Sequence, residues 1–194
     1  LHEIWSVCKA DWIWYIFRSF RELRIRIIFN PFFRSTVRSF DEFLKGFTEI
    51  KPLSNFELMN ICKKIKNFKG VFMRDELNDV PFTENGSFIL NTDSSDNDGT
   101  HWTCLCINNS SCIYFDPYGL PPPTAVLEFC KIASDRIYSS FPIQNLNSVL
   151  CGHFSAYVLL RLNDGVDFFE VLEELYNNKD KYRSEEHTSE LQSR

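Results

Sequence analysis

The sequence has 194 residues, a formal net charge of −5 and 44% hydrophobic residues. This length supports one domain with a sizeable core, and the acidic balance argues against general nucleic-acid binding through bulk charge, with a local basic patch left open. The seven cysteines are irregularly spaced and no secretory signal is visible, so we expect free thiols in an intracellular, reducing compartment, either cytoplasm or nucleus. No apolar run is long enough to cross a membrane, and Cys104, Cys106 and Cys112 lack the spacing of a zinc site.

The two ends of the chain differ in character from its middle. Residues 1–50 mix basic and aromatic side chains, and 17–29 ("FRSFRELRIRIIF") could form a basic amphipathic helix that touches a membrane, a partner or the core. We favour the alternative that 1–50 is an extra segment packed on the domain, or sequence never made as protein. Residues 183–194 ("RSEEHTSELQSR") resemble the translation of a sequencing-library adapter, so we leave them out. The expected domain spans 53–182.

The first half of this domain predicts one helix followed by strands. Ser54 and Glu57 form a capping-box pattern that opens a helix, and Gly70 marks the expected exit from that segment. Residues 86–91 ("GSFILN") predict a short strand. Two short apolar runs at 101–107 and 112–115 flank a four-residue polar loop and predict an antiparallel hairpin.

The second half predicts mainly helices. Thr124 is the expected cap of a helix whose apolar stripe extends to Phe141, while residues 151–162 are apolar on nearly every side, which is typical of a buried central helix. Asn147 or Ser148 is the expected N-cap of that helix, and 167–176 predicts an amphipathic helix. The predicted fold class is α+β, with a small antiparallel sheet, surrounding helices and a buried helix at the centre.

Cys151 lies at the expected start of the buried helix, which makes it a candidate nucleophile. The thiolate is the reactive form of cysteine, and the unpaired N–H groups and positive dipole end of a helix N-terminus stabilise an anion. Cysteine is also among the residues most often buried for packing alone. The position therefore raises the possibility of catalysis but leaves a structural thiol as the alternative.

A nucleophilic cysteine needs a base, and the sequence offers few. The histidines are His2, His101, His153 and His187. His2 is terminal, His187 lies in the adapter-like tail, and His153 is two positions from Cys151, a spacing at which helical side chains do not face each other. His101 remains. Asp116 closes the second strand of the hairpin that His101 opens, so we expect both at the same edge of the sheet, where Asp116 would orient the imidazole.

Acyl transfer also requires hydrogen-bond donors for an oxyanion. The backbone N–H of Cys151 is one candidate. Gln144, seven residues earlier, would supply a side-chain amide, with Asn145 and Asn147 as rivals. Gly152 after the nucleophile leaves room for substrate and for close backbone packing.

The ordered set "HW", "FDPYG", a glutamine and "CGHF" resembles the adenovirus-type (adenain-like) cysteine proteases, which are related to the papain-like and Ulp-type enzymes. The resemblance covers about residues 53–176 and is closest to the Polinton/Maverick-element branch. It implies His101 as general base, Asp116 as orienting acid, Gln144 as oxyanion donor and Cys151 as nucleophile. It also implies Trp102 as a wall of the substrate groove.

The resemblance implies a cysteine endopeptidase (a thiol protease) that acts on protein or peptide and processes virion-like precursors of a mobile element or virus. It implies no metal or organic cofactor. The DNA and peptide activators of the family have no residue match here. Two alternatives stay open: a deconjugase for ubiquitin-like proteins that uses the same site, and a catalytically inactive, domesticated binding module.

Overall fold

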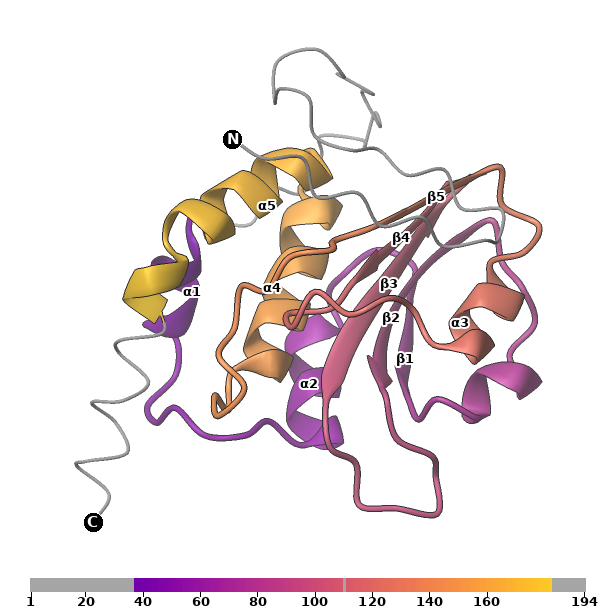
Figure 1. Cartoon of the computed structure of the whole chain (residues 1–194), viewed down its shortest axis with the longest axis horizontal. Helices are drawn as coiled ribbons and strands as arrows, with labels where there is room; N and C mark the ends of the chain where they lie inside the picture. Colours follow the sequence, from indigo (N-terminus) through magenta and orange to yellow (C-terminus); the bar gives the residue numbers. More distant parts are fainter. Residues whose placement is uncertain (1–36, 110, 183–194) are drawn as a thin grey trace.

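The computed structural model describes residues 37–109 and 111–182. In chain order the elements are α1 (Phe40–Leu44), α2 (Asn55–Cys62), β1 (Phe68–Phe72), a 3-10 helix (Glu76–Asp79), β2 (Asn85–Asn91), β3 (Trp102–Asn108), β4 (Ser111–Phe115), α3 (Thr124–Phe129), β5 (Asp135–Tyr138), α4 (Cys151–Asn163) and α5 (Phe168–Asn177). The predicted α+β class is confirmed, with helices grouped around a single sheet in the described residues (Figure 1). The stretch 17–29 and the tail 183–194 lie outside those residues.

The sheet has five strands in the order β1-β2-β3-β4-β5. Its three central strands are antiparallel, and the predicted β3–β4 hairpin is present with Cys104 opposite Phe115 and Asn108 opposite Ser111. Both edge strands run parallel to their neighbours, β1 to β2 and β5 to β4. The sheet is therefore mixed rather than antiparallel throughout.

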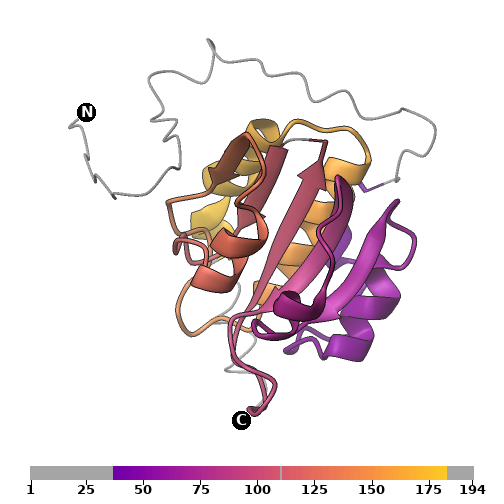
Figure 2. The same ribbon diagram turned by 90° about the vertical axis from the view of Figure 1, so that its right-hand side faces the viewer.

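Both faces of the sheet are buried, and alternate residues of β3 serve opposite layers. Cys104 and Cys106 face the layer formed by α4, α5, α1 and α2, whereas Leu105 and Ile107 face the layer formed by α3 and the 3-10 helix. Figure 2 shows α3 in front of the sheet and the C-terminal helices behind it. Burial on both sides explains why β3 is apolar at successive positions instead of alternating with polar residues.

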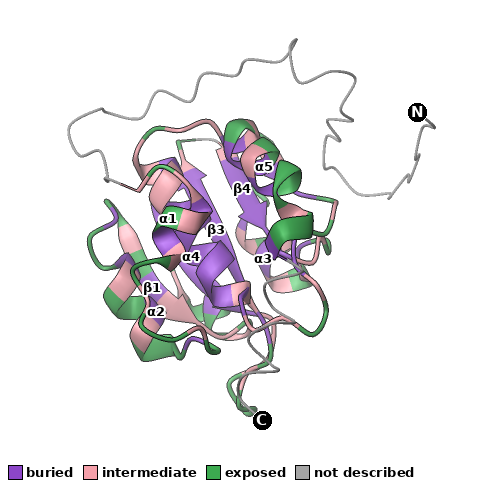
Figure 3. Ribbon diagram, turned by 90° about the vertical axis from the view of Figure 1, so that its left-hand side faces the viewer, coloured by how far each residue is buried: buried purple, intermediate pink, exposed green. Residues whose placement is uncertain are grey.

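Helix α4 packs across the middle of the sheet and is the most enclosed helix of the described chain. Its residues from Gly152 to Leu159 are all buried, and Figure 3 shows α4 beneath the more exposed α1 and α5. The Ser155 hydroxyl donates a hydrogen bond to the Trp102 carbonyl at 3.0 Å, which joins α4 directly to the start of β3. The prediction of a buried central helix is confirmed, and its first residue is Cys151.

The described part of the N-terminal segment packs on this core. The Phe40 ring stacks on Phe154 of α4 with 4.2 Å between the centroids, and the Arg161 guanidinium donates to the Val37 carbonyl at 3.0 Å. Residues 37–44 thus belong to the same hydrophobic unit as α4. Within the described ranges, no helix is long and apolar enough to span a bilayer.

The helix starts show where local capping signals hold. The predicted capping box of α2 is present, with the Ser54 hydroxyl accepting from the Glu57 N–H and the Glu57 carboxylate accepting from the Ser54 N–H. At α4 the predicted caps Asn147 and Ser148 are wrong, because the N-cap residue is Leu150 and gives no side-chain cap. The first N–H groups of α4 therefore receive no side-chain oxygen from the N-cap.

Two of the strands, β1 and β5, were not predicted from the sequence. The helix predicted from Thr124 toward Phe141 ends at Phe129, and β5 occupies Asp135–Tyr138. Gly70 does not mark the exit of the α2 segment; it lies inside β1 at a register shift, with φ of 141°. Both missed strands pair in parallel at an edge of the sheet, and such pairing leaves little local sequence signal.

Candidate active site

The imidazole of His101 and the carboxylate of Asp116 meet at one edge of the sheet. His101 immediately precedes β3 and Asp116 immediately follows β4, so the hairpin brings the two together. The distance from His101 Nε2 to Asp116 Oδ1 is 2.8 Å, and both side chains are buried. A carboxylate can only accept, so Nε2–H donates and the tautomer of a neutral His101 is fixed with Nδ1 unprotonated.

Asp116 is itself held in place by hydrogen bonds from the Tyr118 backbone and the Ser139 side chain. Its Oδ1 also accepts from the Tyr118 N–H at 2.7 Å, and its carbonyl accepts from the Ser139 hydroxyl at 3.3 Å. The carboxylate therefore forms a turn with the following residues while it orients His101. This combines the turn-starter role common for Asp-Pro with a potential catalytic one.

Cys151 lies close to the His101 ring. It is the first residue of α4 and is half-buried, whereas the other cysteines in the described residues (Cys62, Cys104, Cys106, Cys112 and Cys130) are buried. The Nδ1 atom of His101 is buried and has no partner at hydrogen-bond distance. Cys151 nevertheless lies near enough to influence the ring's titration.

The electrostatics of His101 favour the imidazolium. Burial alone would lower the pKa of His101, but the hydrogen bond with Asp116, the nearby Cys151 thiol and the charges of both groups outweigh burial and raise the pKa to about 9. At neutral pH the site therefore favours a proton on His101. A proton taken from Cys151 would be held there, beside the sulfur.

Gln144 lies in the loop before α4 and is tied to the segment that follows Asp116. The backbone N–H groups of Ile143 and Gln144 both donate to the Pro117 carbonyl, at 2.9 and 3.1 Å. The Gln144 side chain is buried, and its Nε2 donates to the Ser148 carbonyl at 2.9 Å. One N–H of the amide is thus used to fix its orientation, and a second remains for another acceptor. Of the two rivals, Asn145 is half-buried and Asn147 is exposed.

Trp102 and Gly152 lie together on the side of the site that faces α2. The Trp102 indole N–H donates to the Leu53 carbonyl at 2.8 Å, which fixes the ring. A Cβ at Gly152 would come within 3.2 Å of the Leu53 side chain and 3.3 Å of Trp102. The small size of Gly152 thus permits close packing between α4 and the Trp102–Leu53 pair.

Tyr118 is a site residue that the sequence analysis did not identify. Its ring stacks on His101, with 4.1 Å between centroids and an interplanar angle of 15°, and its hydroxyl donates to the Leu146 carbonyl at 3.3 Å. Tyr118 therefore joins the His101–Asp116 pair to the loop that carries Gln144. An aromatic residue two positions after the predicted orienting acid was the available signal.

The remaining described histidine lies away from the reactive groups. His153 is fully buried in α4 and packs edge-on against Phe47, with 4.6 Å between the rings. The expectation that it does not face Cys151 agrees with this position. No cluster of three or more histidine, cysteine or acidic side chains within the described ranges could hold a metal ion.

No family model matches this sequence, and the search among curated proteins gives no match. Among solved structures, the ASFV pS273R protease is similar at 18% identity and a TM-score of 0.46, over 66% of this chain and 66% of that one. The SUMO protease Ulp1 with its catalytic cysteine oxidised to a sulfinic acid is similar at 16% identity and a TM-score of 0.40, over 64% of this chain and 70% of that one. AvrA delL154 with IP6 and CoA follows at 23% identity and a TM-score of 0.36, over 55% and 47%. The alignment thus spans about two thirds of the ASFV protease and about half of AvrA.

Proposed function

We propose that this protein is a cysteine endopeptidase in which Cys151 is the nucleophile and His101 the general base and acid. One observation carries the proposal. A buried imidazole is hydrogen-bonded to the Asp116 carboxylate, and the thiol of the first residue of α4 lies near enough to help raise the pKa of that imidazole. A structural cysteine needs neither an imidazole neighbour nor a fixed tautomer, whereas a nucleophilic one needs both.

The proposed reaction begins with transfer of the Cys151 proton to His101. The thiolate attacks the carbonyl carbon of a peptide bond, and the carbonyl oxygen becomes an oxyanion. The backbone N–H of Cys151 and the second N–H of the Gln144 amide would donate to that oxygen. Each such donor contributes about a hundredfold or more to the rate. Asp116 stabilises the imidazolium and keeps its orientation.

Collapse of the tetrahedral intermediate breaks the carbon–nitrogen bond. The imidazolium of His101 gives its proton to the departing amine, and the acyl group stays on Cys151 as a thioester. A water molecule then loses a proton to His101 and attacks the thioester. This releases the carboxylic acid product and regenerates the thiol.

The natural substrates we propose are virion-like precursor proteins of a mobile element or virus, as the sequence resemblance implies. The resemblance assigns Trp102 to the wall of a groove that admits a narrow, glycine-containing stretch of substrate. The free cysteines of the described residues fit the proposed action in a reducing compartment. Parallel digestion of capsid-type precursors and ubiquitin-like fusions tests this choice, and cleavage of the fusions alone would favour a deconjugase.

Thiol labelling tests the catalytic proposal without knowledge of the substrate. We expect iodoacetamide at pH 7 to modify Cys151 in the folded protein much faster than an ordinary thiol, because the pair supplies thiolate. Cys151→Ala provides the background from all other cysteines. Equal rates in the wild type and in His101→Ala would contradict an activated pair and would favour a binding module.

A further inference from the structure

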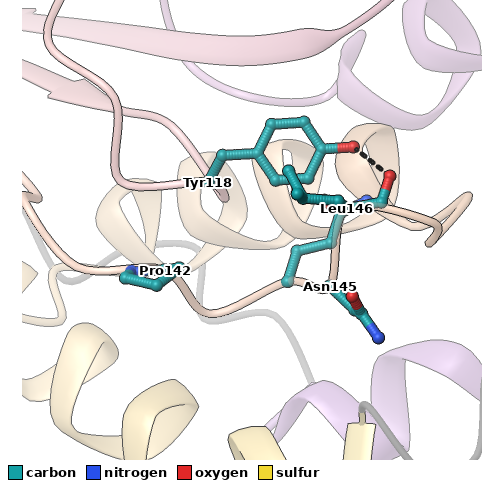
Figure 4. Close-up of a pocket in the computed structure, with 5 residues that line it drawn as sticks. Tyr118, Pro142, Asn145 and Leu146 are labelled. Atoms are coloured by element: carbon teal, nitrogen blue, oxygen red, sulfur yellow. Dashed lines mark hydrogen bonds between the residues drawn. The ribbon is translucent and has the colours of Figure 1, made fainter.

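A cavity of about 310 Å³ lies beside the proposed active site, and no step of the reaction above uses it. It is lined by Tyr118, Pro142, Gln144, Asn145 and Leu146. Figure 4 shows the Tyr118 ring next to Leu146, with Pro142 and Asn145 on the loop that leads to Leu146. The lining contains no charged side chain, and its volume is at the lower end of the range for ligand pockets.

The walls of this cavity are held in place before any ligand binds. The Tyr118 hydroxyl donates to the Leu146 carbonyl at 3.3 Å, and the Pro117 carbonyl accepts from the Gln144 N–H at 3.1 Å. Gly119, with φ of 70°, lies so close to Phe141 that a Cβ there would be 2.5 Å from its carbonyl carbon. The two loops that enclose the cavity are thus joined at several points. A ligand would meet a formed pocket rather than order a loose one.

The cavity adjoins the groups that act on the departing half of a substrate. Its Tyr118 wall stacks on His101, and its Gln144 wall carries the proposed oxyanion donor. The departing amine must reach His101 to receive its proton. The chain that follows the cleaved bond therefore starts next to Tyr118, while the acyl half leads away from His101.

The apolar part of the lining is open to solvent. Leu146 is 78% exposed, although it lies in a loop pinned on both sides. Covering an exposed leucine at a pocket rim with an apolar group removes apolar surface from water, so a large apolar side chain is favoured over a charged one. Asn145 at the rim offers an amide that can bond to peptide backbone.

We propose that this cavity binds the apolar side chain of the residue immediately after the cleaved bond. This inference rests on the proposed function, since the leaving amine is defined by the reaction of Cys151. Leucine, methionine or phenylalanine fits the uncharged walls, whereas aspartate would lose hydration with no cation to pair with. The cavity would then help to select the cleavage site through the residue that follows the cleaved bond.

Acyl transfer to added amines tests the proposal without a known substrate. N-acetyl-glycylglycine p-nitrophenyl ester acylates Cys151 and releases p-nitrophenolate. The thioester then reacts with water or with an added amino-acid amide, whose nitrogen attacks the carbonyl, gives a proton to His101 and displaces Cys151 as the thiol. The amine enters from the position of the leaving group, so the ratio of amide to acid product reports its binding there.

We expect leucinamide and phenylalaninamide to give a ratio of amide to acid product about tenfold higher than glycinamide or aspartic acid α-amide. This is the scale of discrimination by an apolar pocket. Leu146→Ser should largely remove this preference. Because the p-nitrophenyl group also departs from this side, p-nitrophenolate release by the variant serves only to show that Cys151 is still acylated. Ile132→Ser is the matched control, since Ile132 is an exposed apolar residue (65%) outside the cavity. It should keep the preference.

Two results would overturn the inference while leaving the protease proposal in place. One is p-nitrophenolate release with no preference among the amines. The other is a preference that Leu146→Ser leaves unchanged. If the wild type releases no more p-nitrophenolate than Cys151→Ala, the proposed function fails, and the inference fails with it.

Discussion

Two buried histidines lie close to Cys151 in sequence or in space, and their surroundings are opposite. His101 is hydrogen-bonded to a carboxylate and has a thiol nearby, and its pKa is raised to about 9. His153 is enclosed in α4 against Phe47, has no hydrogen-bond partner on either nitrogen, and its pKa is lowered to about 4, chiefly by burial. Both rings are out of solvent, so burial is not what separates them.

The difference shows what raises the pKa of a buried histidine. Desolvation lowers the pKa of both rings, and only at His101 do a carboxylate and a thiol reverse the effect. His153 is closer to Cys151 along the chain, but the helix directs it away. Distance along the chain is therefore a poor guide to which histidine lies beside the Cys151 thiol.

The first prediction compares the effects of substituting each of the two histidines. His101→Ala should lower kcat/KM for ester or peptide hydrolysis by about a thousandfold, through loss of general acid–base catalysis. His153→Leu should leave kcat/KM close to the wild-type value. Steady-state kinetics at pH 7 on both variants provide the measurement, with Cys151→Ala as the inactive reference. Comparable losses in both variants would contradict the contrast drawn between the two rings.

A second prediction leaves both histidines in place. Gln144→Ala should lower kcat by about a hundredfold with a smaller change in KM, because an oxyanion donor acts mainly in the transition state. Asn145→Ala is the control, since that side chain is half-buried nearby. An unchanged rate in Gln144→Ala would move the oxyanion role to Asn145 or Asn147.

A third prediction makes the surroundings of His101 more like those of His153. Asn at position 116 keeps an oxygen for His101 and for the Tyr118 N–H but removes the charge. Asp116→Asn should lower kcat/KM at neutral pH by only a part of the acid–base contribution, about tenfold. The wild-type rate should fall at alkaline pH with an apparent pKa of about 9, and this limb should move toward the ordinary 6.5 in the variant. The pH–rate profile measures it, and an unmoved limb would disprove the role of Asp116.

The fourth prediction concerns stability rather than rate. His153 has a pKa of about 4 in the folded state and 6.5 when unfolded, so the unfolded chain takes up a proton first and stability is lost as pH falls below about 6.5. Relative to His153→Leu, the wild type should lose about 2 kcal/mol of unfolding free energy between pH 7 and pH 5. Urea denaturation at both pH values measures this. His101 contributes with the opposite sign, since its raised pKa gives stability that is lost as pH rises toward about 9.

Local patterns predicted the parts of the fold that local interactions determine. The Ser54–Glu57 capping box, the β3–β4 hairpin and the buried helix from Cys151 are all read from neighbouring residues. The edge strands β1 and β5 were missed because their partners lie outside each segment, and parallel pairing leaves no turn signature.

The site residues also divide into those that local patterns predict and those that they do not. The meeting of His101 and Asp116 follows from the hairpin, so topology was enough to predict it. The choice among Gln144, Asn145 and Asn147 depends on how an irregular loop folds against the Pro117 carbonyl, which no spacing rule gives. The stacking of Tyr118 on His101 and the cavity beside it depend on that same loop.

The β3–β4 hairpin also has a consequence for a newly synthesised chain. It joins two strands through a very short turn, so the ends that carry His101 and Asp116 can meet early, at a small loss of chain entropy. Cys151 lies on α4, which packs across the sheet, so the proposed nucleophile comes beside His101 only once both the hairpin and α4 are in place. A chain that has formed the hairpin alone would hold His101 and Asp116 together without the sulfur.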